Sequence, residues 1–105
     1  MGIQVMVVYR PKDGRAADLD AEVRDHVTIL RRLGLATDSP SLAMRAPDGA
    51  VVECFEWSSR EAIEAAHSHP EVQSMWERFG ECCDYGTLGD LPNASVLFAE
   101  FERIH

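Results

Sequence analysis

The chain has 105 residues, of which 46% are hydrophobic, so residues 1–105 have room for one domain with a modest core. The formal net charge of -8 disfavours nucleic-acid and membrane partners, because a phosphate backbone or an anionic leaflet would repel the protein. Three cysteines, two of them adjacent, suit a reducing compartment, and no apolar stretch reads as a signal or a membrane span, which predicts a cytoplasmic protein.

The first half of the chain predicts a strand, a helix and a second strand. Residues 3–10 are apolar on both faces, which is typical of a strand that is covered on both sides. The following segment repeats apolar residues at helical spacing, namely Leu19, Val23, Val27 and Leu30. Gly34 is well placed to end that helix, and residues 42–46 read as the next strand.

A hairpin is predicted around Asp48-Gly49, which joins the strand at 42–46 to a strand at 51–57. Counting across a four-residue turn from Pro47 to Ala50 pairs Ala46 with Val51 and Met44 with Glu53. This register places Glu53 on one sheet face with apolar neighbours, namely Leu42, Met44, Val51, Phe55 and Trp57.

The second half predicts two consecutive helices and a final strand. Ser59, or alternatively Ser58, is a suitable N-cap for a helix over residues 60–68. Pro70 then occupies a favourable first position for another helix, with an apolar stripe of Val72, Met75, Trp76 and Phe79. The tail after Tyr85 is rich in Gly, Asp and Pro, and we expect the last strand within residues 98–104.

These elements predict an α+β fold of ferredoxin-like βαββαβ order with a four-stranded antiparallel sheet. Both helices of such a fold lie on one face of the sheet, so the other face is exposed unless a second sheet covers it. Because both faces are apolar here, we expect a homodimer with two sheets packed face to face. The space between each sheet and its helices is the expected cleft for a small molecule.

One segment resembles a known family: it is Glu53-Cys54-Phe55-Glu56-Trp57-Ser58-Ser59, followed by Glu61, Ala62, His67 and Trp76. It is similar to the dimeric α+β barrel superfamily, with the antibiotic biosynthesis monooxygenase family as the nearest match. The resemblance implies a dimeric α+β barrel and includes cofactor-independent oxygenation of polycyclic phenols among its activities. Haem degradation, also found in that family, is disfavoured: aligned on Trp57, the family's helical Trp falls on Ala66, and its iron-binding His falls on Trp76.

The candidate catalytic residues are Glu53 and His67. An apolar environment around Glu53 suits a general base, although an edge position or a salt bridge is the plainer interpretation. His67 follows apolar positions on its helix and could point into the cleft, whereas helix-flank histidines are more often solvated. His26, at the border of the first helix's apolar stripe, would frame a pocket together with His67.

The candidate ligand-binding residues are His26 and four aromatic side chains that could stack on an aromatic molecule, namely Tyr9, Phe55, Trp57 and Trp76. Aromatics at these spacings are also typical of a core. No metal is expected, because His67 and His69 point apart on a helix and the adjacent Cys82 and Cys83 seldom chelate one ion. No cofactor is expected, because the chain lacks flavin and nicotinamide fingerprints.

Two functions follow from these residues. The first is a homodimer that binds a small apolar or aromatic molecule and acts as a cofactor-independent monooxygenase of an aromatic or polyketide-like substrate. The alternative is a non-catalytic ligand-binding or structural dimer in which the same residues are core. An RNA-recognition domain is disfavoured, since basic and aromatic strand motifs are missing.

Overall fold

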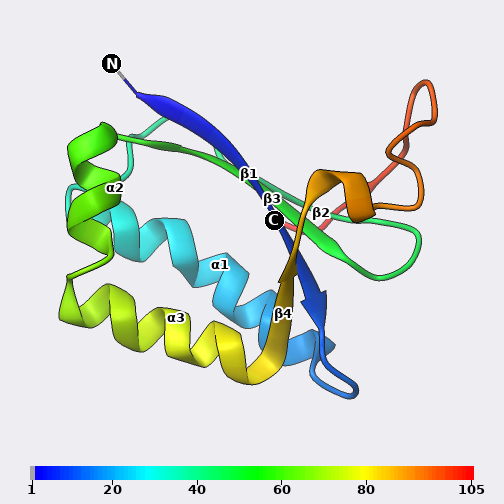
Figure 1. Cartoon of the computed structure of the whole chain (residues 1–105), viewed down its shortest axis with the longest axis horizontal. Coiled ribbons are helices and arrows are strands. Elements are labelled where there is room, and N and C mark those ends of the chain that lie inside the picture. Colours follow the sequence, from blue (N-terminus) through cyan, green and yellow to red (C-terminus); the bar gives the residue numbers. More distant parts are fainter. Residues whose placement is uncertain (1) are drawn as a thin grey trace.

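The computed structural model describes residues 2–105. Over these residues the chain forms three helices and one five-stranded antiparallel sheet with the strand order β4-β1-β3-β2-β5 (Figure 1). The elements are β1 (Ile3–Pro11), α1 (Ala16–Arg32), β2 (Leu42–Arg45), β3 (Val51–Trp57), α2 (Arg60–Ala66), α3 (Pro70–Cys82), β4 (Cys83–Gly86), the 3-10 turn η1 (Leu88–Asp90) and β5 (Glu102–Arg103). The predicted α+β class is confirmed, and the order is compatible with a ferredoxin-like sheet.

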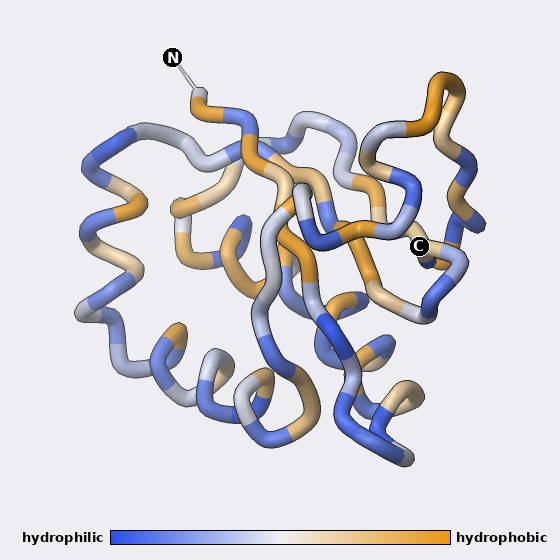
Figure 2. The backbone as a smooth tube through the Cα atoms, turned by 45° about the vertical axis from the view of Figure 1, so that its right-hand side comes forward, coloured by the Kyte–Doolittle hydropathy of each residue, from blue (hydrophilic) through white to orange (hydrophobic). Residues whose placement is uncertain are grey.

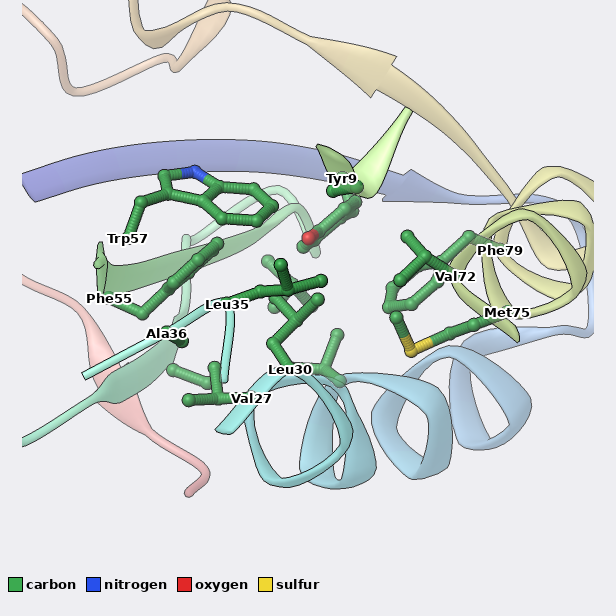
Figure 3. Close-up of a cluster of buried hydrophobic side chains, with 14 of the residues drawn as sticks. Tyr9, Val27, Leu30, Leu35, Ala36, Phe55, Trp57, Val72, Met75 and Phe79 are labelled. Atoms are coloured by element: carbon green, nitrogen blue, oxygen red, sulfur yellow. The ribbon is translucent and has the colours of Figure 1, made fainter. Parts of the chain in front are cut away.

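The main core lies between the sheet and its helices. Helices α1 and α3 lie side by side over one sheet face, and α2 sits at the end where β3 finishes (Figure 1). Leu30 of α1, Phe55 of β3 and Phe79 of α3 are buried in one cluster between these layers (Figure 3). Burial of each such side chain favours folding by about 1.5–3 kcal/mol, so this layer positions the helices over the sheet.

The predicted helix ends are largely confirmed. Ser59, not Ser58, caps α2, because its hydroxyl accepts a hydrogen bond from the Ala62 backbone N–H at 3.0 Å. Gly34 follows α1 in the left-handed region with a φ of 76°, as expected of a residue that ends a helix. Helix α2 ends at Ala66, two residues earlier than predicted, and the chain becomes extended at His69 before Pro70 begins α3.

The predicted hairpin register is wrong by one residue. β2 pairs Ala43 with Glu53, so Ala43 and Arg45 share the face of Glu53 in place of Leu42 and Met44. The loop has three residues instead of four, because the Ala46 N–H donates to the Ala50 carbonyl at 2.8 Å. Gly49 supports this tighter loop with a φ of 94°, which is the left-handed position of a three-residue hairpin.

The final strand predicted within residues 98–104 is present as β5, but it is not the fourth strand of the ferredoxin-like order. The strand that completes the ferredoxin-like order is β4, which begins directly after α3 and pairs with β1. Strand β5 falls within the expected residues 98–104, but it adds a fifth strand at the outer edge of β2. Strand β4 has only four residues and runs into a segment rich in Gly, Asp and Pro, which indicates a loop from Tyr85 onwards.

The sheet face opposite the helices is partly covered by residues 87–101, here called the C-terminal arm. Leu91 of the arm is buried in a second cluster with Val8 and Val52, and Phe101 packs against it. Met6 belongs to the same sheet face but stays 50% exposed. The arm therefore covers part of a sheet face that we expected a second sheet to cover. None of the helices in the described residues is long and apolar enough to cross a membrane.

Candidate functional site

A cavity of about 640 Å³ lies where the N-terminal half of β1 meets the helices. It is open to solvent on one side, because β4 pairs with β1 from Val8 to Pro11 and leaves the β1 edge before Val8 uncovered in the described structure. The lining residues are Val5, Met6, Val7, Tyr9, His26, Phe55, Trp57, His67, Trp76 and Tyr85. They come from β1, α1, β3, β4 and the segment from α2 to α3.

The cavity brings together nearly all the residues singled out from the sequence. Each predicted ligand-binding residue and His67 line it, whereas Glu53 lies behind the wall and contacts two of the lining residues. The β1 residues Val5, Met6 and Val7 also line the cavity but were not predicted, although Val5 and Val7 alternate with Tyr9 on one strand face. Tyr85 is a further lining residue that was not predicted, because the Gly, Asp and Pro residues after it indicate a loop and not the strand β4.

Glu53 is the centre of a buried hydrogen-bond network. Its side chain is almost fully enclosed, and its Oε1 atom accepts a hydrogen bond from the Tyr9 hydroxyl at 2.7 Å. The same oxygen lies 2.8 Å from Nδ1 of His26. A buried carboxylate is costly unless it is hydrogen-bonded, and these two partners supply that compensation. The observed neighbours thus support Glu53 as the orienting group of His26 instead of as a residue that touches a ligand.

The two ring nitrogens of His26 have different partners, which define its tautomer. The carboxylate of Glu53 can only accept, so Nδ1 carries the proton and donates it to that contact. The indole N–H of Trp76 donates to Nε2 at a long distance of 3.5 Å, so Nε2 acts as an acceptor. His26 therefore presents a basic nitrogen towards Trp76 and the cavity, with a carboxylate fixing the ring from behind.

Aromatic rings hold this network in place. The Tyr9 ring stacks on Phe79 with centroids 5.0 Å apart, and the His26 ring meets Phe55 and Phe79 edge to face. Burial, and next the negative charge of Glu53, raise the pKa of Tyr9 well above its ordinary value. The Tyr9 hydroxyl consequently stays protonated at neutral pH and remains a donor to Glu53.

His67 occupies a different position from the one expected of a buried base. Its side chain is exposed, and its Nδ1 atom lies 2.8 Å from the Ile63 carbonyl, which can only accept. The ring meets Trp76 edge to face with centroids 5.2 Å apart, so the pair borders the cavity opening. Of the two histidines that line the cavity, His26 therefore has the better-oriented basic nitrogen.

The cavity combines an apolar wall with one oriented base. Of the described residues that line it, none is a Lys, Arg, Asp or Glu, so the fixed charge nearest to a ligand is that of Glu53 behind His26. Within residues 2–105, no three His, Cys, Asp or Glu side chains are grouped as metal ligands would be. The arrangement suits the binding of a flat apolar molecule and the removal of one proton from it.

Comparison with known proteins identifies no relative: no family model, no curated protein and no solved structure matches the chain.

Proposed function

We propose that the protein binds a small, neutral, aromatic molecule that carries a phenolic hydroxyl, and that it oxidises this molecule as a cofactor-independent monooxygenase. The observation that carries the proposal is the contact of 2.8 Å between His26 and the buried Glu53 at the wall of an aromatic cavity. The volume of about 640 Å³ is of the size of ordinary small-molecule sites, roughly 300–1,000 Å³.

The chemistry starts with proton transfer from the ligand hydroxyl to Nε2 of His26. Glu53 stabilises the imidazolium that forms, in the same way as a carboxylate supports the histidine of a hydrolytic triad. The phenolate has carbanion character at a ring carbon, which transfers an electron to O₂ and then bonds to it as a peroxide. Loss of water leaves a quinone carbonyl. One oxygen atom enters the product, the other enters water, and the substrate supplies all four electrons.

The lining also indicates which ligands are favoured. Trp57 and Trp76 offer flat apolar surfaces for aromatic stacking. The absence of Lys and Arg among the described lining residues, together with a formal net charge of -8, disfavours a ligand that arrives as an anion. A neutral phenol that ionises only beside His26 avoids that repulsion.

The alternative is a binding protein that holds the same ligand without oxidising it. One observation favours this alternative: His26 is only 3% exposed and its Nε2 atom faces the Trp76 indole, so a ligand hydroxyl has to displace that contact. Oxygen uptake separates the two functions, because binding alone consumes none.

The test uses 1-naphthol as a neutral two-ring phenol, with an oxygen electrode and a fluorescence titration of Trp57 and Trp76. We expect saturable binding and oxygen uptake by the unmodified protein. His26→Gln should slow uptake by about 10²–10⁴-fold, the usual contribution of general-base catalysis. The matched control is His69→Asn, which removes a histidine outside the cavity and keeps a residue that caps α3. Equal loss in both variants, or uptake that survives His26→Gln, would contradict the assignment.

We also propose that the protein is a homodimer, as the resemblance to dimeric α+β barrels implies. Met6, at the end of the sheet face that the C-terminal arm leaves uncovered, supports self-association, because it is 50% exposed. Light scattering on the purified protein tests this proposal, and a mass of one chain, 11.7 kDa, would contradict it.

A further inference from the structure

We infer that a second copy of this chain closes the cavity, with the tip of one protomer's C-terminal arm packed on the cavity opening of the other. The arm tip is defined as residues 96–98, and the cavity opening is defined by Met6 and Tyr85. The inference uses the cavity assigned above as a ligand site, but the contact itself is tested without any ligand.

The arm tip is an apolar surface with no cover in its own chain. Val96, Leu97 and Phe98 are 56%, 85% and 88% exposed. Leu97 and Phe98 are the most exposed of the large apolar side chains in the described structure. In Figure 2 the loop at the upper right carries this hydrophobic tip away from the rest of the molecule. Three adjacent apolar side chains in water are a feature of surfaces that bind another protein.

The residues of the arm on either side of the tip are held by packing and hydrogen bonds, and these contacts fix the position of the tip. Leu91 is buried at its base, and the Asn93 side-chain amide donates to the Glu100 carbonyl at 3.0 Å across the loop. The Val96 N–H donates to the Asn93 carbonyl at 3.2 Å. Phe98 has a φ of 57°, a left-handed conformation that a bulky residue rarely adopts. A partner that holds the Phe98 ring would offset this strain.

The cavity opening is the matching surface on the same chain. Met6 and Tyr85 are 50% and 57% exposed and both line the cavity. The β1 edge beside them has no neighbouring strand in the described structure, because β4 begins its pairing at Val8. The cavity is therefore open at this apolar edge. In an isolated chain, a ligand in the cavity would contact solvent there.

The two proposed contact surfaces lie in the uncharged parts of the chain, where two copies can meet without charge repulsion. The chain has a formal net charge of -8, so two copies repel each other unless they meet through uncharged surfaces. The two longest runs without a charged side chain are residues 1–9 and residues 91–99. The first run contains Met6 and the second contains the arm tip. One chain thus carries both surfaces, and a two-fold exchange covers both tips and both openings at once.

The tip reaches the opening of another copy rather than its own. In Figures 1 and 2 the loop that bears it points away from the helices and from the N-terminal half of β1. Its stem is held on the sheet face opposite the helices by Leu91, which packs with Val8 and Val52. If each arm tip covers the opening of the partner protomer, the stem of the arm keeps its observed position.

Disulfide trapping between two separately purified variants tests the contact. Met6→Cys and Leu97→Cys, each combined with Cys54→Ala to remove the half-buried thiol, are mixed at about 10 μM under mild oxidation. A dimer contact gives the two thiols a local concentration near the millimolar range, so the mixed disulfide should form on the order of a hundredfold faster than by random collision. The matched control replaces Leu97→Cys by Glu77→Cys, which is exposed on α3.

A second variant tests whether the arm tip is needed for the dimer, without a change in the folded core of the protomer. Leu97→Ser together with Phe98→Ser changes only exposed arm-tip side chains, so the far-ultraviolet circular dichroism of the folded protomer should stay the same. We expect this variant to be monomeric and to bind 1-naphthol at least about tenfold more weakly, since one wall of the cavity is lost. A mixed disulfide that forms no faster than the control, or a double Ser variant that remains fully dimeric, would overturn the inference. If trapping succeeds while 1-naphthol does not bind, the arm contact stands and the proposed function fails.

Discussion

Glu53 contacts Nδ1 of His26, and its environment explains why a carboxylate is tolerated there. It is buried at 2% exposure, yet its Oε1 atom has two donors, the Tyr9 hydroxyl and Nδ1 of His26. Removing a partner from such a network leaves a charge with too few hydrogen bonds. Tyr9 therefore supports the orientation of His26 indirectly, by fixing the carboxylate that fixes the imidazole.

Glu53→Gln tests that role. The amide oxygen can still accept from Tyr9 and His26, but the negative charge that stabilises the imidazolium is gone. We expect oxidation of 1-naphthol to slow by about 10²–10⁴-fold in kcat, with KM changed much less. The control is Glu56→Gln, on the same strand but on the opposite face, where Glu56 bonds to Thr37 and Ser39. Full turnover by Glu53→Gln would show that the carboxylate has no part in catalysis.

At the scale of elements, the β2–β3 hairpin is joined to β1 by a charged contact. The Arg10 guanidinium donates to Asp48 at 2.6 Å, and the other Asp48 oxygen accepts from the Ala50 N–H at 3.1 Å. The Arg10 contact, followed by the Ala50 hydrogen bond, holds the pKa of Asp48 below its ordinary value. The pair thus links the loop that sets the register to a neighbouring strand.

The lowered pKa of Asp48 predicts a direction for the pH dependence of stability. Because the carboxyl has a lower pKa in the folded state than in the unfolded chain, its contribution is complete above about pH 4 to 5. It is lost as the pH falls through the folded-state pKa. Asp48→Asn should therefore lower the free energy of unfolding at pH 7 by at most about 1 kcal/mol, since both side chains are partly exposed.

Urea unfolding at pH 7 and near pH 2.5 measures this effect. The gap between the unmodified protein and Asp48→Asn should narrow at the lower pH. Asp38→Asn, an exposed carboxylate outside the hairpin, serves as the control. A gap that is equal at both pH values would assign the effect of Asp48 to something other than its charge.

The elements also show what the sequence could and could not predict. Apolar periodicity was sufficient for α1 and α3, because each presents one buried stripe to the sheet. The predicted hairpin register is wrong because the length of the loop depends on the left-handed conformation of Gly49. A loop that is shorter by one residue places Leu42 and Met44 on the other sheet face. The contact between His26 and Glu53 joins residues 27 positions apart, which local patterns do not encode.

At the scale of the whole molecule, the layers place the cavity at an edge instead of in the centre. The sheet and the two long helices close around the main core, while the short β4 leaves the N-terminal half of β1 uncovered (Figure 1). The same chain continues into the C-terminal arm on the opposite sheet face. The fold therefore places His26 in one wall of the cavity and leaves an opening beside the unpaired part of β1.

We propose that His26, held by Glu53, removes a proton from a ligand in the aromatic cavity. Ultraviolet difference spectroscopy of bound 1-naphthol at pH 7 without oxygen tests it most directly, because the phenol and the phenolate absorb differently. We predict that the unmodified protein on saturation shows a larger phenolate fraction than free 1-naphthol at the same pH, and that His26→Gln shows no such increase. A ligand that stays neutral in the unmodified protein, or equal ionisation in the two proteins, would contradict the claim.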